Sequence, residues 1–156
     1  MKLTRNQYIE KVTPFVIKAS SGSGLFPSLF MAQAILESAD GNSTLASVYN
    51  NHFGIKADKN WKGKVVNMKT REVINGSDQI ITDGFRVYDS PEQSFIDRVK
   101  FLKENARYKA VFAAATPLLQ AIELKKAKYA TDPNYDTVLQ QIIKYNNLIT
   151  LDQKKK

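Results

Sequence analysis

The 156-residue sequence contains no cysteine and a single histidine, His52. The lack of cysteine excludes a disulfide framework, a thiolate nucleophile and any cysteine-ligated zinc or iron–sulfur site. One histidine argues against a histidine-rich metal site and against a Ser-His-Asp triad, although a triad needs only one. We therefore expect no metal site and no cofactor.

Long apolar runs are also missing. No segment approaches the ~18 consecutive apolar residues that would span a bilayer, and residues 1–7 carry positive charge without the apolar stretch of a signal peptide behind them. The sequence therefore predicts no membrane insertion and no cleavable leader in this chain. The route by which it would be exported stays open.

The chain does contain enough apolar residues for a core, because 43% of them are hydrophobic and 10% are aromatic. Its length suits one domain, for which ~100–200 residues is usual. The 23 Lys and Arg against 15 Asp and Glu leave a formal net charge of +8. This excess predicts an anionic partner, such as nucleic acid, an acidic surface or an acidic polymer. We find no nucleic-acid-binding motif, so we do not expect nucleic acid to be the partner. We expect the chain to be a monomer.

Helical patterns dominate both ends of the chain. Thr4 and Gln7 form a capping box before apolar residues at helical spacing as far as residues 20–24. Residues 28–36 are apolar nearly all round, which predicts a buried helix that ends near Gly41. Three further helices are predicted to begin at Pro behind a capping residue, the first with Gln93 completing a second capping box: Ser90-Pro91, Thr116-Pro117 and Asp132-Pro133.

The middle of the chain, about residues 53–90, carries strand signals. Residues 64–74 and 79–88 flank Asn75-Gly76, and both of these residues tolerate the positive φ that a tight hairpin turn requires. The sequence therefore predicts an α+β fold, with a mainly helical lobe and a small β-hairpin lobe.

The fifteen carboxylates are the natural candidates for acid–base chemistry, and most lie in turns, in a first helical turn or beside Lys and Arg. Glu37 differs because it closes the apolar helix, at the negative end of the helix dipole. Burial and the dipole both favour the neutral acid, which predicts a raised pKa and a proton donor. The alternative is a helix-end Glu that reaches solvent or pairs with a lysine.

Glu72 is the second unusual carboxylate. It shares its strand face with Val66, Met68 and Ile74, whereas the other face carries Lys69 and Arg71. An acidic residue on the mostly apolar face is a candidate for chemistry. The alternatives are a bulge that turns it outward, or a cross-strand pair with a basic residue of the hairpin.

One neutral acid and one charged carboxylate on two lobes suit glycoside hydrolysis. Aromatic rings pack on sugars, and amides bond acetamido groups. The candidate substrate-binding residues are therefore Asn50, Asn51, Phe53, Trp61, Phe85 and Tyr88. The alternative for the aromatic residues is the core of the hairpin lobe, and His52 is better explained as a packed, hydrogen-bonded side chain than as a catalytic base.

Six motifs, in order, resemble glycoside hydrolase family 73, the peptidoglycan-cleaving N-acetylglucosaminidases related to the flagellar rod-cap muramidase domain and to bacterial autolysins. The resemblance runs from about residue 5 to residue 150. The motifs lie at residues 32–38 and 50–56 (AQAILES and NNHFGIK), 61–64 (WKGK), 70–76 (TREVING), 85–88 (FRVY) and 129–135 (YATDPNY).

The resemblance implies a lysozyme-like fold with a groove between the two lobes. Relatives often bear repeated wall-binding modules, and this chain departs from them: we expect a single catalytic domain over residues 1–156, with the β-lobe at about residues 53–90 and no separate wall-binding module. The resemblance places the general acid at Glu37 and a second carboxylate at Glu72. It also implicates a tyrosine, Tyr129 or Tyr135. Asp132 and Pro133 of the same segment are explained by helix initiation alone.

The implied activity is hydrolysis of peptidoglycan glycan strands at the cell wall, at the β-1,4 bond on the reducing side of N-acetylglucosamine. A muramidase or a lytic transglycosylase on the same fold is the alternative, because fold does not fix the bond that is cut. A less favoured alternative is a protein without enzymatic activity, either a basic nucleic-acid-binding module or a non-catalytic glycan-binding relative.

Overall fold

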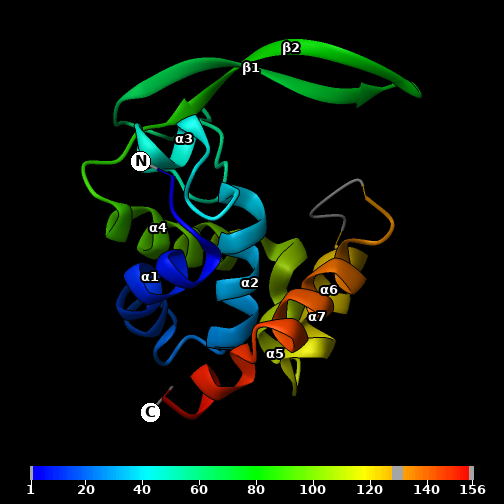
Figure 1. Ribbon diagram of the computed structural model, residues 1–156. Helices are drawn as coiled ribbons and strands as arrows, with labels where there is room; N and C mark the ends of the chain where they lie inside the picture. Colours follow the sequence, from blue (N-terminus) through cyan, green and yellow to red (C-terminus); the bar gives the residue numbers. More distant parts are fainter. Residues whose placement is uncertain (1, 128–131, 155–156) are drawn as a thin grey trace.

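Helix α2 (Pro27–Ser38) runs through the middle of the helical lobe, and other helices surround it (Figure 1). The computed structural model describes residues 2–127 and 132–154. The remaining elements are α1 (Arg5–Ser20), α3 (Thr44–Ser47), β1 (Val65–Ile74), β2 (Ser77–Arg86), α4 (Pro91–Glu104), the 3₁₀ helix η1 (Ala106–Tyr108), α5 (Lys109–Ala113), α6 (Pro117–Lys126), α7 (Tyr135–Tyr145) and the 3₁₀ helix η2 (Leu148–Lys154). The predicted α+β class is confirmed.

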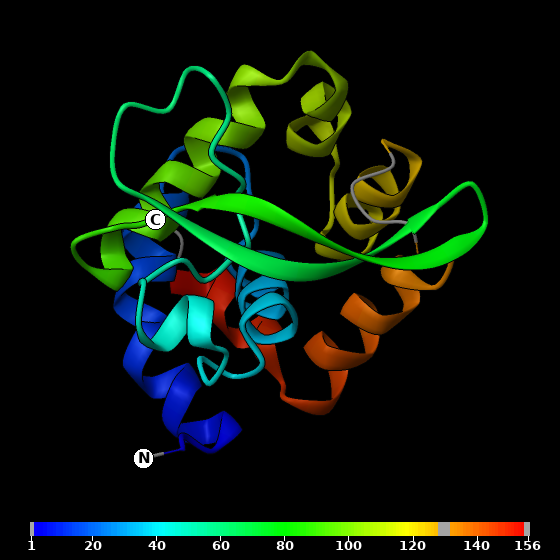
Figure 2. The ribbon, with the colours of Figure 1, turned by 90° about the horizontal axis from the view of Figure 1, so that it is seen from above.

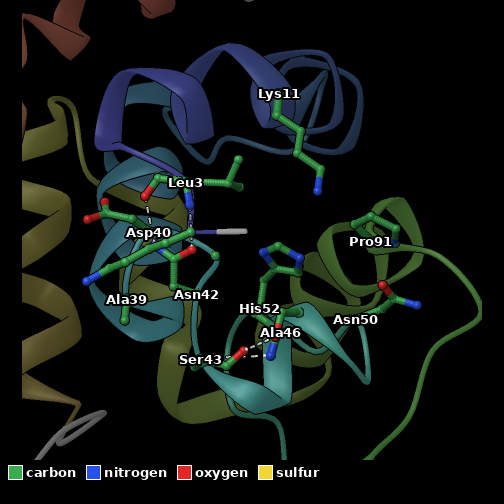
Figure 3. A pocket seen from close by; sticks show the side chains of 13 residues that line it. Leu3, Lys11, Ala39, Asp40, Asn42, Ser43, Ala46, Asn50, His52 and Pro91 are labelled. Carbon is green, nitrogen blue, oxygen red and sulfur yellow. Dashed lines mark hydrogen bonds between the residues drawn. The ribbon is translucent and has the colours of Figure 1, made fainter.

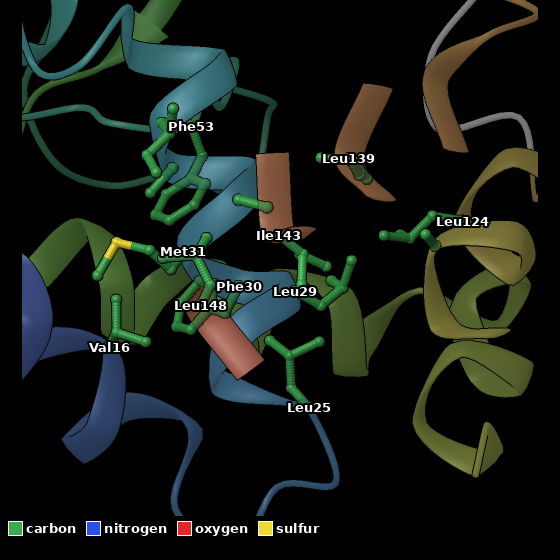
Figure 4. Close-up of a cluster of buried hydrophobic side chains, with 14 of the residues drawn as sticks. Val16, Leu25, Leu29, Phe30, Met31, Phe53, Leu124, Leu139, Ile143 and Leu148 are labelled. Atoms are coloured by element: carbon green, nitrogen blue, oxygen red, sulfur yellow. The ribbon is translucent and has the colours of Figure 1, made fainter. Parts of the chain in front are cut away.

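The core forms around α2 because this helix is apolar on every side. Helices α1, α6, α7 and η2 all contact it. Leu29, Phe30 and Met31 are completely buried, and they meet side chains such as Val16 and Leu148 from the surrounding helices (Figure 4). Burying one such side chain contributes about 1.5–3 kcal/mol. Within the described ranges, no helix is long and apolar enough to cross a membrane.

The predicted caps hold at two helix starts. Thr4 and Gln7 form the expected capping box at α1. Thr116 accepts a hydrogen bond from the Leu119 backbone N–H, at 3.1 Å, ahead of Pro117. In both cases the hydroxyl satisfies an amide that has no partner inside the helix.

Two other predictions of helix starts need correction. Helix α4 begins at Pro91 as predicted, but the Ser90 side chain makes no capping bond, and Gln93 accepts from the Asp89 N–H at 3.1 Å. The second capping box is therefore wrong. Helix α7 begins at Tyr135, two residues later than predicted, because the Asp132 side chain accepts from Asn134 N–H, at 2.8 Å, in a turn before the helix.

Strands β1 and β2 form the predicted antiparallel hairpin, which crosses above the helical lobe (Figure 2). Asn75 and Gly76 form its two-residue turn with φ values of 53° and 79°, and Ile74 pairs with Ser77. Backbone bonds join the base of β2 to the segment before the hairpin: the Arg86 N–H donates to Ile55, and the Ala57 N–H to Gly84. The sheet itself spans less of the chain than the predicted 53–90 lobe.

His52 is packed under α1, as the sequence predicted. It is 3% exposed, its Nδ1 lies 2.7 Å from the Tyr8 hydroxyl, and the two rings are stacked. Burial, helped by the positive charge of Lys11, lowers the pKa of His52 to about 4, so the imidazole is neutral at pH 7. This pair attaches residues 50–56 to the helical lobe.

Replacing Tyr8 with Phe removes the hydroxyl and leaves His52 Nδ1 without its buried partner. We expect the free energy of unfolding to fall by about 1–3 kcal/mol, the cost of one unsatisfied buried polar group. Chemical denaturation measures this loss. Tyr145→Phe is the matched control, because Tyr145 is 78% exposed, and it should change stability by less than about 0.5 kcal/mol. An equal loss in both variants would contradict the assignment.

Candidate active site

A cavity of about 690 Å³ contains both candidate carboxylates, Glu37 from the end of α2 and Glu72 from β1. Helix α4 and the 105–108 segment supply further walls. The other lining residues are Leu45, Phe53, Gly54, Ile55, Lys56, Asp58, Thr70, Phe85, Arg98, Phe101, Arg107 and Tyr108. The predicted pairing of one carboxylate from each lobe is therefore present in space.

Glu37 lies in the last turn of α2, where the chain then turns sharply. Ala39 and Asp40 adopt left-handed conformations with φ of 52° and 58°, and Gly41 follows with φ of 80°. A side chain at Gly41 would come within 2.6 Å of the Tyr8 ring. Glycine is therefore required where α2 stops, and this stop leaves Glu37 at the edge of the cavity.

Burial raises the pKa of Glu37, as the sequence predicted, while the charge of Arg98 and a hydrogen bond from Tyr135 act in the opposite direction. Because the raising influence is the larger, Glu37 holds a proton to a higher pH than an ordinary glutamate. Among the described residues, no ion pair joins Glu37 to a lysine.

Tyr135, the first residue of α7, is hydrogen-bonded to two residues of α2, Gln33 and Glu37. Its hydroxyl accepts a hydrogen bond from Gln33 Nε2, at 3.0 Å, and donates to Glu37 Oε1, at 3.4 Å. Gln33 lies one helical turn before Glu37, and all but 3% of Tyr135 is buried. The tyrosine therefore acts on the Glu37 carboxyl through its hydroxyl, and its ring belongs to the core.

Glu72 lies on the partly buried face of β1, with Val66, Met68 and Thr70, as its position in the strand predicted. It pairs with Gln79 in a regular register, so no bulge turns it outward. Its Oε1 lies 3.0 Å from Lys56 Nζ, which also lies 2.9 Å from Asp83 Oδ2.

Lys56 belongs to the segment before the hairpin, so the partner of Glu72 differs from the cross-strand partner considered above. Hydrogen bonds to Asp83 and Glu72 raise the pKa of Lys56. Its ammonium connects both strands to the body of the protein. Lys56 thereby fixes where Glu72 stands in the cavity.

The predicted aromatic residues divide into three groups. Phe53 and Phe85 line the cavity even though both are buried. Trp61 lines a neighbouring cavity of about 540 Å³ that shares Asp58 and Phe101 with the first. Tyr88 lines neither cavity, and its hydroxyl donates to Asp97 of α4.

The structure does not bring Asn50 and Asn51 to the cavity. The Asn51 amide is buried and fully bonded: Nδ2 donates to the carbonyls of Ile55 and Arg86, and Oδ1 accepts from Ile55 N–H. Asn50 donates to the Tyr88 carbonyl at 2.9 Å. Acetamido binding does not fit Asn51, which instead joins the two ends of the lobe. Tyr129 lies outside the described residues.

Arg98 is the main residue that the sequence analysis missed. It is 1% exposed, lines the cavity, and lies with its guanidinium 5.3 Å from the centre of the Phe53 ring. Its position was visible in the sequence, because Ser94, Arg98 and Leu102 recur every four residues on the buried face of α4. A basic residue on such a face indicates a buried acidic neighbour. No group of three potential metal ligands occurs in residues 2–127 and 132–154.

Comparison with known proteins gives a consistent family. The model of the Glucosaminidase family, described as mannosyl-glycoprotein endo-beta-N-acetylglucosaminidase, matches residues 13–148. Peptidoglycan hydrolase FlgJ of Salmonella typhimurium is 41% identical over 129 residues, which are 80% of this chain and 41% of FlgJ. A probable N-acetylmuramidase of Lactococcus lactis subsp. lactis is 40% identical over 152 residues, or 93% of this chain and 34% of that protein.

The fold comparison agrees. The catalytic domain of the autolysin Auto from Listeria monocytogenes superimposes with a TM-score of 0.84 at 29% identity, covering 97% of this chain and 91% of the domain. The fold is thus lysozyme-like, as predicted. The chain spans less than half the length of the two relatives above.

Glu37→Gln should stabilise the protein at pH 7. A carboxyl whose pKa is raised by burial stabilises the fold at low pH, and this contribution is lost as the pH rises through the raised value. The neutral amide avoids that loss, so we expect the free energy of unfolding to increase by about 0.5–2 kcal/mol. Unfolding at pH 7 and below pH ~4, the ordinary range of Glu, measures the effect.

The gain should disappear at the lower pH, where the wild-type carboxyl is also neutral. Glu10→Gln, at an exposed position of α1, is the control and should show no comparable gain. A variant at Glu37 that is less stable than the wild type at pH 7 would contradict a buried, destabilised carboxylate.

Proposed function

Because the chain belongs to the Glucosaminidase family, glycoside hydrolase family 73, we propose that it hydrolyses the glycan strands of peptidoglycan at the cell wall. The bond cut is the β-1,4 linkage on the reducing side of N-acetylglucosamine. The observation that carries this proposal is the Glu37 carboxyl, whose pKa is raised in a cavity that also holds a carboxylate of the opposite lobe.

Glu37 acts as the general acid. Its carboxyl keeps its proton to a higher pH than usual and can donate it to the glycosidic oxygen while positive charge develops at C1 of N-acetylglucosamine. The Tyr135 hydroxyl donates a hydrogen bond to Oε1 of Glu37, so the proton that is transferred to the substrate is carried by Oε2. Gln33 holds that hydroxyl from the preceding turn of α2.

Glu72 provides negative charge on the other side of the cavity. It stabilises the oxocarbenium-like transition state or activates the attacking water, and Lys56 holds it in place. Since Glu72 is carried by a hairpin that projects from the helical lobe (Figure 1), a shift of the hairpin would change its distance from the substrate. The acetamido group of the substrate is an alternative nucleophile.

The net charge of +8 supports the same substrate. Peptidoglycan carries carboxylates, and walls often carry phosphate polymers as well. A basic domain is attracted to such a surface before any specific contact forms.

Cleavage on the reducing side of N-acetylmuramic acid is the second candidate, because the Lactococcus relatives are named probable N-acetylmuramidases. Both reactions need a general acid at the position of Glu37. The geometry of the carboxyl groups supports hydrolysis at either linkage, so the products must distinguish them.

Glu37→Gln keeps the shape of the side chain but removes the proton donor. We expect the rate of wall hydrolysis to fall by about 10²–10⁴-fold, the usual contribution of a general acid. Glu72→Gln should cause a smaller loss, because water or the substrate's acetamido group can replace a base. Turbidity of a suspension of purified walls measures both, with Glu10→Gln as the control. A wild-type rate in Glu37→Gln would refute the assignment, and a larger loss in Glu72→Gln would reverse the two roles.

The fragments released from purified peptidoglycan identify the bond. We expect each new reducing end to be N-acetylglucosamine, which mass spectrometry after borohydride reduction detects as the corresponding alditol. A reducing N-acetylmuramic acid would instead establish a muramidase, and a 1,6-anhydro product a lytic transglycosylase.

A further inference from the structure

A second and larger cavity, of about 900 Å³, lies between the N-terminal segment, α1 and α3 (Figure 3). Ligand sites commonly fall in the range of ~300–1,000 Å³. Its walls are Lys2, Leu3, Lys11, Ala39, Asp40, Gly41, Asn42, Ser43, Ala46, Ser47, Asn50, His52 and Pro91. None of these residues lines the cavity of Glu37 and Glu72.

Residues adjacent in the sequence line the two cavities. Leu45 and Phe53 face the cavity of the carboxylates, whereas their neighbours Ala46 and His52 face the second one. The second cavity is therefore a separate site that adjoins the first across α3 and the residues around His52.

Positive charge dominates the second cavity. Lys2 and Lys11 form no ion pair with any residue in the ranges 2–127 and 132–154. The one acidic residue among its lining residues is Asp40, and its carboxylate is paired with Arg5 at 3.0 Å. Two ammonium groups thus remain without a counterion from the described part of the chain.

His52 adds a buried donor to the same space. Figure 3 shows that Lys11 and His52 point into one open volume from opposite walls. Nδ1 of His52 is occupied by Tyr8, and no hydrogen bond to Nε2 comes from the described residues. When the Tyr8 hydroxyl donates to Nδ1, the neutral ring carries its proton on Nε2, which is then a donor without a partner among the described residues, on a side chain that lines the cavity.

The remaining polar groups also favour an acceptor as ligand. The Ser43 oxygen accepts from the Ala46 N–H, which leaves its own hydroxyl proton free to donate. Asn42 is unavailable because both ends of its amide bond the Leu3 backbone. The Lys11 ammonium, an imidazole N–H and a hydroxyl provide donors, and Lys2 adds a second positive charge to the lining residues, which suits a carboxylate or phosphate group.

We propose that this cavity is an anion-binding site that holds a carboxylate or phosphate group of the cell wall while the neighbouring cavity acts on the glycan. That the anion belongs to the wall rests on the proposed function, whereas the anion site itself rests on Lys11, Lys2 and His52. The site would keep the domain on its polymeric substrate between cleavage events.

The single histidine makes a direct test possible, because its ring signals in an NMR spectrum need no further assignment. We expect inorganic phosphate, titrated at constant ionic strength against chloride, to shift the His52 ring signals in a saturable manner, with acetate doing so more weakly. The ¹⁵N shifts should also identify the Nε2–H tautomer. Lys11→Gln should weaken phosphate binding by about ten-fold, the effect of one charge-assisted contact.

Lys18→Gln is the matched control, because Lys18 lies on the same helix but pairs with Glu92 and does not line the cavity. It should bind phosphate as the wild type does. Absence of a saturable shift, an Nε2 without a proton, or equal weakening in both variants would overturn the proposal. A non-saturable shift that follows ionic strength alone would mean diffuse screening and would overturn it as well.

Measuring the binding of the variants to purified walls then distinguishes the two sources of the anion, phosphate polymers and peptide carboxylates. Lys11→Gln should bind purified walls less tightly than Lys18→Gln while both cleave short soluble glycan fragments at the wild-type rate. Removing phosphate polymers from the wall abolishes the difference if phosphate is the ligand, and amidating the peptide carboxylates abolishes it if carboxylate is. An equal affinity of both variants for untreated walls would overturn the wall as the source. Failure of the wild type to cleave any glycan would refute the proposed function, while the NMR titration would still decide the anion site.

Discussion

The burial of α2 from Pro27 to Ile35 is the constraint on which the rest of the structure depends. A helix that is apolar on every side needs neighbours all round, and α1, α6, α7 and η2 provide them. In its last turn Leu36 is exposed and Ser38 is buried, and the half-buried Glu37 lies between them at the edge of the core. The burial that stabilises the core is the same burial that raises the pKa of the carboxyl.

Packing around α2 also supplies the groups that act on Glu37. Helix α7 lies against α2 and positions the Tyr135 hydroxyl between Gln33 and Glu37, while α4 positions the Arg98 charge within reach. These two groups oppose the effect of burial without cancelling it. The carboxyl is therefore oriented and has a raised pKa, a combination that a fully exposed helix end could not provide.

The hairpin contributes the second carboxylate by a different kind of contact. Few apolar groups hold it to the helical lobe, and most of its residues are exposed. Its position depends on backbone bonds at the base of β2 and on the ammonium of Lys56 between Glu72 and Asp83. The helical lobe thus holds a rigidly packed acid, and the hairpin holds a carboxylate fixed by polar contacts that water can weaken.

Local pattern determined a large part of this protein. The apolar run of residues 28–36, the Asn75-Gly76 turn and the two-residue period of β1 were sufficient to predict the buried helix, the hairpin and the unusual settings of Glu37 and Glu72, because these features depend on residues close in sequence. Only the tertiary structure decided which distant groups meet them. Lys56, Arg98 and Tyr135 reach the two carboxylates from other elements, Asn51 turns inward to bond the lobe, and Lys11 and His52 face one cavity. Such contacts follow from how the helices pack in three dimensions: the periodicity of α4 places Arg98 on a buried face, but it does not say which residue lies opposite.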